Sequence, residues 1–564
     1  MSGVELSPAW TLILGAALVP FLRGAARGAW TVALPVAGML QFWLLPAGEY
    51  GQLQFLGEQL LLVRVDRWSS LFTLVFLIAA LVSSIYALHV RDWVQPAAGL
   101  AYAGAAIGAV LAGDLLTLFA FWELTALTSV FLIWARRTER AYRAGMRYIA
   151  IQLVSGMLLL FGALQQLEAT GTLRFEHLGL DAPGGMLIFL AFGIKCAFPL
   201  LHNWLQDAYP EATEAGTVFL SAFTTKLAVY ALARGYAGTE ELIWIGAAMT
   251  AFPIFFAVIE NDLRRVLAYS LNNQLGFMVV GIGIGTELAL NGTAAHAFSH
   301  ILYKALLFMS MGAVLYRVGT VNGSELGGLY KSMPWTTGFC VVGAASISAF
   351  PLFSGFISKS MILTAAAGEG LLVTWLVLLF ASAGVFHHSG IKIPYFAFFA
   401  HDSGKRCAEA PANMLVAMAI TAALCVGIGV YPGPLYALLP FAVDFVPYTG
   451  SHVLTQLQLL LFSALAFSVL MRTGIYPPEM RLVNLDSDWL YRRAAPAFLE
   501  TVAAAGTAAG REMRALLAGP WRGTRAWIER HHGPGGLLAR TWTTGGMALW
   551  MALFLAGYLL VFYL

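Results

Sequence analysis

Charged residues are scarce in this chain. Of its 564 residues, only 11% are Asp, Glu, Lys or Arg, while 59% are hydrophobic, and the mean hydropathy is +0.74. A soluble protein needs far more charge on its surface. The composition therefore argues against a soluble domain and predicts an integral membrane protein.

Cysteine is rare and dispersed. The sequence contains four cysteines and no Cys-x-x-Cys pair: Cys196, Cys340, Cys407 and Cys425. This spacing indicates neither an iron–sulfur cluster nor a zinc site. The net charge of +3 is small and the arginines are spread over many loops, so no nucleic-acid partner is expected. We expect no metal or cofactor on this chain, and redox chemistry would require another subunit.

Lysine is also rare, and its positions are informative. Five of the seven lysines lie inside strongly apolar stretches, whereas all 26 arginines lie in connecting segments or at span ends. Arginine keeps its proton in proteins, but a buried lysine can titrate near neutral pH. Cations restricted to lysine at membrane depth therefore predict proton transfer. The five are Lys195, Lys226, Lys304, Lys359 and Lys392.

Apolar runs occupy most of the chain. Because a bilayer core requires about 20 apolar residues per helix, the sequence divides into about 14 to 16 transmembrane spans. The predicted fold is an all-α polytopic bundle. The spans are expected near 8–22, 30–46, 69–89, 97–112, 113–135, 146–167, 183–206, 213–235, 241–259, 263–285, 292–317, 335–366, 371–397, 412–431, 453–471 and 543–563.

Basic and acidic residues alternate between successive connections. One set of loops carries Arg91 and the arginine cluster of 136–147, whereas the opposite set carries residues such as Glu168 and Asp181. Arginine-rich loops are typically cytoplasmic. The pattern predicts that both termini lie on the outer side of the membrane.

The arginine-rich segment 472–542 is not expected to cross the membrane. From about Asp486 to Leu517 it alternates apolar and basic residues before Pro520. A helix of about 30 residues with such a mixed face suits the membrane surface. It is either a brace that contacts several spans or a neighbouring subunit, or an ordinary surface helix before the last anchor.

Two spans contain a proline close to a lysine. Pro199 follows Lys195 by four positions, and Pro351 precedes Lys359. Breaks of this kind are tolerated where they line a polar cavity or where a neighbouring helix covers them. Paired broken helices in two halves are typical of inverted-repeat transporters, which bind their substrates near the membrane midplane. The sequence therefore predicts two inverted repeats, each with a broken helix.

Glu123 is the one carboxylate expected near the middle of a span. An isolated ion at that depth costs at least about 2.5 kcal/mol, so it needs a partner, water or a proton. Lys195 is the expected partner, and their contact would control whether Lys195 holds its proton. Lys226 lies in the next span and is expected close by. A static bridge between two helices is the alternative for the pair.

Histidines accompany the lysines further along the chain. His296, His300 and Lys304 are spaced four apart, so a helix places them along one stripe. The favoured interpretation is a proton wire through imidazole rings that ends at Lys359. A metal site is the alternative, but the sequence offers no third ligand nearby. Lower in rank are His202, His387, His388 and Lys392. His202 is either a structural histidine or a relay. Lys392, with His387 and His388 before it, either extends the wire or snorkels toward the cytoplasmic interface, and snorkelling is slightly favoured.

Six stretches carry a resemblance to a known family: LLTLFAFWELTALTSVFLIW, FGIKCAFPLLHNWLQDAYPEA, LRRVLAYSLNNQLGF, HAFSHILYKALLF, GGLYKSMP and SAFPLFSGFISK. Together they resemble the antiporter-like membrane subunits that respiratory complex I and the Mrp-type sodium/proton antiporters share. They span about residues 69–400, and their order is specific although each alone is not. The middle region looks most like the D-type subunit of the Mrp antiporters.

The resemblance implies a role for each buried charge. Glu123 and Lys195 would be the paired acid and lysine of the input half, and Lys226 the central relay. His296 and His300 would be bridging residues, with Lys304 an additional relay and Lys359 the terminal lysine. Some members of the family have glutamate at the position of Lys359, and the group of His387, His388 and Lys392 is not part of the recognised pattern.

These observations predict a proton-conducting subunit of a multisubunit cation/proton antiporter in a bacterial inner membrane. Its expected partners are other membrane subunits, lipid, protons and Na⁺ or another monovalent cation. The alternative is a proton-pumping subunit of a complex I-like, hydrogenase or inorganic-carbon uptake assembly. The predicted parts are N-terminal spans 1–96, antiporter-like halves 97–240 and 241–400, C-terminal spans 401–471, the surface segment 472–542 and a final anchor 543–564.

Overall fold

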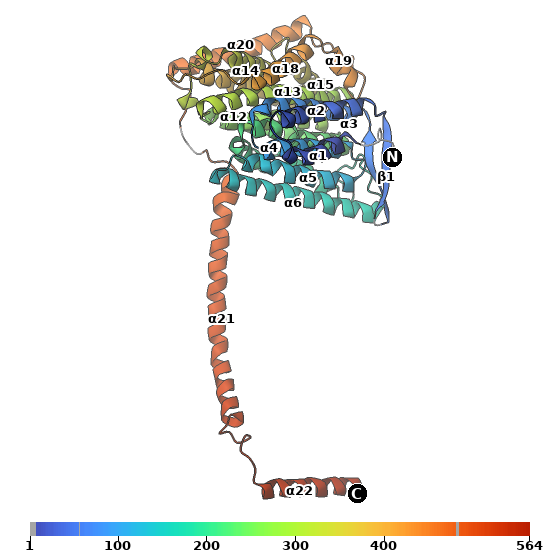
Figure 1. Ribbon diagram of the computed structural model, residues 1–564, viewed down its shortest axis with the longest axis vertical. Helices are drawn as coiled ribbons and strands as arrows, with labels where there is room; N and C mark the ends of the chain where they lie inside the picture. The colour runs from blue at the N-terminus through green and yellow to red at the C-terminus, as the bar shows by residue number, and fades with distance from the viewer. Residues whose placement is uncertain (1–6, 56, 481–483, 564) are drawn as a thin grey trace. The chain divides into compact units, whose positions relative to one another are not determined.

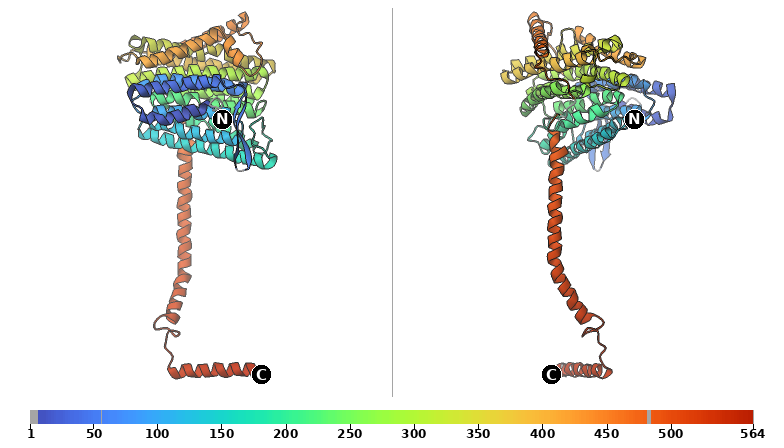
Figure 2. Two further views of the ribbon diagram at one scale, coloured as in Figure 1. Left: turned by 45° about the vertical axis from the view of Figure 1, so that its right-hand side comes forward. Right: turned by 90° about the vertical axis from the view of Figure 1, so that its left-hand side faces the viewer.

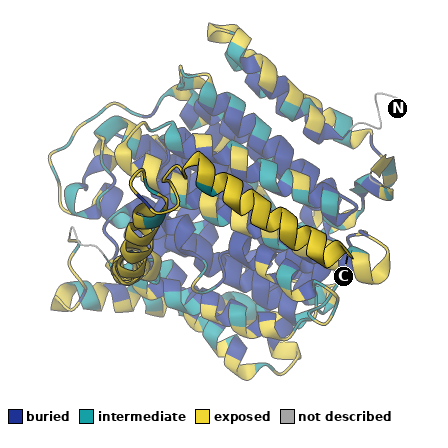
Figure 3. Ribbon diagram, turned by 90° about the horizontal axis from the view of Figure 1, so that it is seen from below, coloured by how far each residue is buried: buried dark blue, intermediate teal, exposed yellow. Residues whose placement is uncertain are grey.

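The computed structural model describes residues 7–55, 57–480 and 484–563 and contains two units, residues 1–484 and residues 485–564. In the first unit, long helices lie side by side (Figures 1 and 2). Most of these helices are apolar on all sides, so they have no single apolar stripe and can pack against neighbouring helices on several faces. Buried residues accordingly fill the interior of this unit (Figure 3). The predicted all-α membrane bundle is confirmed.

The α-helices of the first unit follow in chain order. They are α1 (Pro8–Leu18), α2 (Gly24–Trp43), α3 (Arg67–Tyr86), α4 (Val94–Leu111), α5 (Leu115–Trp134), α6 (Glu139–Thr170), α7 (Gly185–Cys196), α8 (Asn203–Ala208), α9 (Glu214–Ala222), α10 (Thr224–Gly235), α11 (Glu241–Ile259), α12 (Leu263–Ile284), α13 (Glu287–Val318), α14 (Pro334–Ile347), α15 (Ser354–Gly368), α16 (Leu372–Val385), α17 (Lys392–Pro394), α18 (Ala412–Val430), α19 (Gly433–Leu438) and α20 (Gly450–Thr473).

Short 3₁₀ and π segments extend or join these helices. The 3₁₀ segments are η1 (Val19–Phe21), η2 (Ala87–His89), η3 (Tyr209–Glu211), η4 (Gly323–Glu325) and η5 (Leu329–Lys331). Two π-helical segments, η6 (Phe386–Ile391) and η7 (Tyr395–Phe399), flank α17. The span that begins with α16 therefore has wide helical turns before and after the short helix that contains Lys392. Wide turns of this kind are frequent at functional sites.

Each predicted span overlaps a helix or a pair of consecutive helices. Among the described residues, 11 helices are long and apolar enough to cross a membrane unaided, and Pro8–Phe21 and Gly185–Cys196 are shorter apolar helices. The remaining predicted spans are divided by breaks or carry more polar residues. At the centre lies α13, which packs against α3, α9, α12, α14, α15 and α18.

A β-hairpin follows α2, and the sequence analysis did not predict it. Strands β1 (Gly48–Phe55) and β2 (Glu58–Val65) pair antiparallel, with Gly48 opposite Val65 and Phe55 opposite Glu58. Gly57 adopts a φ of +91° in the turn, a conformation that favours glycine. The available signal was this glycine beside the strand-forming run that ends at Val65.

Both predicted helix breaks are present, and they share a four-residue sequence. Ala-Phe-Pro-Leu occurs at 197–200 between α7 and α8, and again at 349–352 between α14 and α15. In both copies the alanine and the leucine have positive φ, +62° and +70° in the first and +58° and +75° in the second. Positive φ is uncommon outside glycine, so one strained loop recurs in the two halves. The repeat is visible in the sequence alone, because both copies read Ala-Phe-Pro-Leu.

A third break was not predicted. Helices α9 and α10 are separated at Phe223, which has φ −103° and ψ −70°. The hydroxyl of Tyr102 on α4 accepts a hydrogen bond from the Thr224 amide at 2.9 Å and pairs with the Thr224 hydroxyl at 2.6 Å. A side chain from another helix therefore satisfies the backbone at the start of α10. Neither proline nor glycine marks this break in the sequence.

The second unit contains the π segment η8 (Leu490–Ala494), α21 (Ala495–His532) and α22 (Thr544–Tyr563). Both α-helices are exposed along their described length (Figure 3). The predicted surface helix is wrong in its limits, because α21 continues to His532 with Pro520 inside it. In an exposed helix, water can bind the carbonyl that loses its partner at a proline. The predicted final anchor coincides with α22, which is long and apolar enough to cross a membrane, and residue 564 lies outside the described residues.

Asp66 caps the N-terminus of α3 and links it to α10. Its carboxylate accepts from the Ser69 amide at 2.8 Å and from Arg234 of α10 at 2.6 Å. Burial opposes ionisation, but Arg234 and the Ser69 amide lower the pKa of Asp66 below its usual value. The contribution of Asp66 to the free energy of unfolding is therefore fully present above the unfolded pKa of about 3.9. It is lost as the pH falls through the lower pKa of the folded protein.

We expect Asp66→Ala to destabilise the protein by about 1–2 kcal/mol, since a helix cap and an ion pair are both lost. Asp66→Asn retains an acceptor for the cap and should cost less. Thermal unfolding of the detergent-solubilised protein at neutral pH measures the difference. An unchanged midpoint for Asp66→Ala would show that this contact is not stabilising.

Candidate functional site

The five lysines that the sequence placed at membrane depth are all buried. Their side chains are no more than 1% exposed: Lys195, Lys226, Lys304, Lys359 and Lys392. The other two lysines are not buried, and Lys331 forms a surface ion pair with Asp402 at 2.9 Å. The sorting of lysine by depth is therefore confirmed. A buried ammonium needs several acceptors, so the surroundings of each lysine define the site.

Lys195 lies at the end of α7, next to the first break. Its Nζ donates to the carbonyl of Trp122 at 2.6 Å and to Thr125 Oγ1 at 2.9 Å, both on α5, and lies 4.5 Å from the centre of the Trp122 ring. These acceptors flank Glu123 in the chain. The Lys195 ammonium is thus bound to α5, the helix that carries Glu123. Its hydrogen bonds go to a backbone carbonyl and a hydroxyl and not to the Glu123 carboxylate.

The predicted contact between Glu123 and Lys195 is absent from this conformation. Among the described residues, Glu123 Oε1 is buried without a hydrogen-bond partner. The two charges still act on each other through space. The reason is geometric: Lys195 finds closer acceptors one residue before and two residues after the acid.

Helix α6 provides the surroundings of Glu123. A Cβ placed on Gly156 would lie 1.6 Å from Glu123 Oε1, so the carboxylate occupies the space that this glycine leaves free. One turn away, Gln152 is fully buried, and neither end of its amide has a partner in the described ranges. Sequence reasoning missed both residues, because a glycine or glutamine in an apolar helix carries no specific signal.

Lys226 lies just after the third break. Its Nζ donates to the carbonyl of Ser221 at 2.7 Å, a backbone group near the end of α9. The interruption at Phe223 frees such carbonyls from helical hydrogen bonding. A fully buried cation therefore has an acceptor that an unbroken helix would not offer.

Helix α13 carries the histidine stripe in the middle of the bundle. The rings of His296 and His300 are stacked with centres 6.1 Å apart, and His296 Nδ1 lies 2.9 Å from Ser358 Oγ of α15. Within the described residues, neither nitrogen of His300 nor Nζ of Lys304 has a hydrogen-bond partner. The predicted alignment along one stripe is confirmed. No group of three potential metal ligands gathers in the part of the chain described.

Lys359 lies beyond the second break, on α15. Its Nζ donates to the carbonyl of Ile347 at 2.8 Å, the last residue of α14, and lies 5.1 Å from the centre of the Phe277 ring. As with Lys226, a break in the backbone supplies the acceptor. The lysine nevertheless follows its Ala-Phe-Pro-Leu loop, whereas Lys195 precedes the other copy.

The lower-ranked residues divide into two groups. His202 lies at the start of α8, where its ring packs against Phe252 at 4.6 Å. His387, His388 and Lys392 share the π-helical region of the span that begins with α16. Snorkelling of Lys392 is wrong: the side chain is fully buried, and its Nζ forms an ion pair with Glu479 at 2.9 Å. Sequence reasoning missed Glu479, which follows the last helix of the first unit in an irregular segment.

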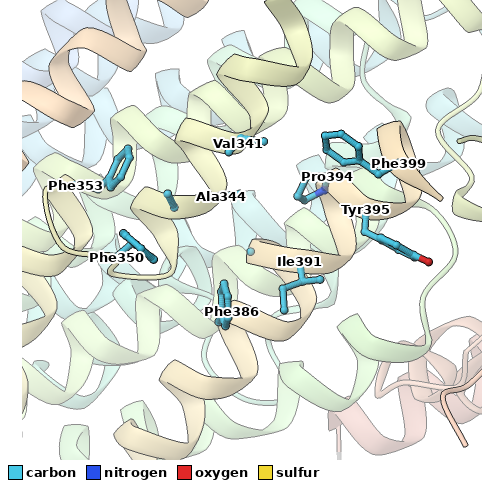
Figure 4. Close-up of a pocket in the computed structure, with 11 residues that line it drawn as sticks. Val341, Ala344, Phe350, Phe353, Phe386, Ile391, Pro394, Tyr395 and Phe399 are labelled. Carbon is cyan, nitrogen blue, oxygen red and sulfur yellow. The ribbon is translucent and has the colours of Figure 1, made fainter. Parts of the chain in front are cut away.

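An apolar cavity of about 570 Å³ borders the second break (Figure 4). Phe350 and Phe353 line one side, and Phe386 and Tyr395 line the other. No Asp, Glu, Lys, Arg or His is among its lining residues. The cavity therefore presents no carboxylate, ammonium, guanidinium or imidazole group.

Residues 112–383 match the protein family described as "NADH:quinone oxidoreductase/Mrp antiporter, TM". Hydrogenase-4 component B of Escherichia coli is 28% identical over 65% of this chain and 62% of its own length. The D-type subunit of the Na(+)/H(+) antiporter of Alkalihalophilus pseudofirmus is 31% identical over 52% of this chain and 63% of its own. The chain thus spans about three fifths of the length of these curated relatives.

Solved structures share the fold. A chain of the archaeal membrane-bound sulfane sulfur reductase matches 98% of this chain and 99% of its own, with a TM-score of 0.71 and 21% identity. A chain of the Mrp complex from Dietzia matches 85% of this chain and 99% of its own, with a TM-score of 0.67 and 21% identity. Residues 112–383 of this membrane protein thus match the transmembrane family shared by NADH:quinone oxidoreductase and the Mrp antiporters, and the chain has the fold of subunits from solved membrane complexes.

Proposed function

We propose that this chain is the proton-conducting subunit of a multisubunit cation/proton antiporter. The observation that carries the proposal is the row of fully buried lysines, of which Lys195, Lys226 and Lys359 donate to carbonyl or hydroxyl oxygens. A permanent charge in such surroundings is costly, whereas a lysine that can release its proton moves between two states of similar free energy. The chain's partners are other membrane subunits, protons and Na⁺ or another monovalent cation.

The proposed route enters at Glu123 and Lys195. Protons continue from there to Lys226, pass His296 and His300, and reach Lys304 and Lys359. Each transfer changes the charge beside the next lysine, which couples neighbouring sites through electrostatics. The buried stripe on α13 supports the middle of this route, because its rings are stacked and two of its polar groups are free to bind a proton or water.

Coupling at the entrance would use the free oxygen of Glu123. When Glu123 loses its proton, its negative charge favours the protonated form of Lys195 across the short gap between them. When Glu123 gains a proton, that support is withdrawn and Lys195 can pass its proton on. The hydrogen bonds from Lys195 to α5 keep the two groups close in both states.

Neutral variants in the intact complex test the proposal. We expect Glu123→Gln and Lys195→Ala each to lower proton-coupled transport by about 100-fold, the scale of a lost proton-transfer group. Dye quenching in membrane vesicles measures the proton gradient, and a native gel verifies assembly. Wild-type transport in either assembled variant would contradict the proposed wire.

A second candidate is a proton pump driven by electron transfer in a complex I-like, hydrogenase or inorganic-carbon uptake assembly. The name of the Escherichia coli relative, a hydrogenase component matching 65% of this chain, favours it. Purification of the native assembly distinguishes the two. A flavin or iron–sulfur spectrum would support the pump, whereas cation-dependent proton exchange without redox centres would support the antiporter.

We place the chain in a bacterial inner membrane, with both termini on the outer side. The alternation of basic and acidic loops supports this orientation. Reaction of single cysteines introduced at exposed positions such as Tyr142 and Trp244 with an impermeant thiol reagent, in intact cells and inverted vesicles, tests it.

A further inference from the structure

The buried group around Lys392 is not used by the proposed route from Glu123 to Lys359. Besides Glu479, the ammonium binds the carbonyls of Val258 at 2.6 Å and Glu260 at 2.7 Å, at the end of α11. If Lys392 served only as a cap for the C-terminus of α11, these carbonyls would be sufficient acceptors for its ammonium. The added carboxylate, only 6% exposed, requires a further explanation.

Glu479 lies between this lysine and a cavity. A volume of about 290 Å³ is lined by Glu479 together with His401 and Ser324, among other residues. His401 is exposed, so the lining includes side chains that reach the protein surface. The carboxylate therefore has Lys392 on one side and a cavity wide enough for several water molecules on the other.

Two histidines lie near Lys392, and the ring of His387 packs against Tyr476, which lines the cavity beside Glu479. His387 and His388 precede Lys392 by five and four residues in the π-helical region, and that spacing places them one turn away. His388 is fully buried, and its electrostatic neighbours include Lys304 and Lys392. In addition, its Nδ1 lies 2.9 Å from Ser389 Oγ, which donates to Ser270 Oγ of α12 at 2.7 Å.

We propose that Glu479 and Lys392 form a gate through which protons pass between the cavity beside His401 and the buried row of lysines, by way of His387 and His388. A proton moves from the Lys392 ammonium to the Glu479 carboxylate, leaving an amine and a carboxylic acid. The acid then releases the proton to water in the cavity and becomes a carboxylate again. The reverse order loads the row.

The surroundings of Glu479 suit this alternation. Burial raises the pKa of its carboxyl above the usual value, against the opposing charge of Lys392. Glu260 carries a second negative charge nearby, but its oxygens accept hydrogen bonds from the amides of Asn261 and Asp262 and from the Asn484 side chain. Glu260 is thus fixed by its neighbours, and Glu479 is the carboxylate that faces the cavity.

The gate rests on the proposed function, and the test separates the two. In vesicles containing the complete complex, we expect Glu479→Gln to lower proton transport by about tenfold, because a proton-transfer group is lost while water in the cavity leaves a slower path. Asp402→Asn is the matched control, since it removes an exposed carboxylate that pairs with Lys331 and Arg406. It should transport at the wild-type rate.

Chemical rescue distinguishes proton transfer from a structural role. Glu479→Ala enlarges the cavity, and we expect added formate, a small carboxylic acid, to restore part of its transport but none of that of Glu479→Gln. If Glu479→Gln does not assemble, Glu479→Gln combined with Lys392→Gln avoids an unpaired buried charge and should transport as slowly. Wild-type transport in either variant, with Lys195→Ala inactive, would overturn the gate alone. Wild-type transport in Lys195→Ala as well would overturn the proposed function.

Discussion

Replacing Lys195 by arginine is expected to stop proton-coupled transport while the complex still assembles. The guanidinium keeps the positive charge and can bind the Trp122 carbonyl and Thr125 hydroxyl that now hold the ammonium. It cannot release its proton near neutral pH. We expect transport to fall by about 100-fold, the scale of a lost proton-transfer group.

Lys331→Arg is the matched control. This lysine is nearly half exposed and pairs with Asp402, so the same substitution there changes a surface ion pair and no buried proton site. Surface pairs contribute about 0–1 kcal/mol, and the control should assemble and transport normally. Transport by Lys195→Arg at the rate of this control would show that the charge of residue 195 is sufficient and that proton release from it is unnecessary.

The sequence alone predicted which segments are long apolar helices and which lysines are buried. Apolar runs of bilayer length located the spans, and the lysines inside those runs are all fully buried in the structure. The expectation that arginine stays outside the interior fails at Arg264, which is also fully buried. Such features depend on one residue and its immediate neighbours. Pro199 and Pro351 predicted their breaks for the same reason, because the missing amide acts locally.

Partners in space were harder to predict. The break at Phe223 depends on Tyr102 from another helix, and the acceptors of Lys195 are a carbonyl and a hydroxyl on α5 instead of the expected carboxylate. Lys392 was placed at the interface because its carboxylate lies 87 positions later in the chain, in a segment without periodicity. The apolar surroundings of a residue in one sequence predict that it is buried, but they do not predict which side chains from other helices contact it.

Gly156→Ala is the second change with a large expected effect. The new methyl group would occupy the position of Glu123 Oε1, to which a Cβ would come within 1.6 Å. Only the end of a flexible side chain stands in the way, so the carboxylate moves and the helices need not. Alanine also favours a helix over glycine by about 1 kcal/mol, which protects the fold of α6. We therefore expect normal assembly with proton transport lowered by about tenfold, because Glu123 is displaced from its site near Lys195.

Gly427→Ala tests whether the effect is specific to that position. Gly427 also lies within an apolar helix, α18, but a Cβ there would meet no atom within 4 Å. This variant should behave as wild type. Combining Gly156→Ala with Glu123→Gln provides the decisive comparison: if the methyl group acts only by moving the acid, the double variant should transport no more slowly than Glu123→Gln alone. A further loss in the double variant would mean that Gly156 acts through helix packing, and wild-type transport in Gly156→Ala would mean that the position of the Glu123 carboxylate does not limit the rate.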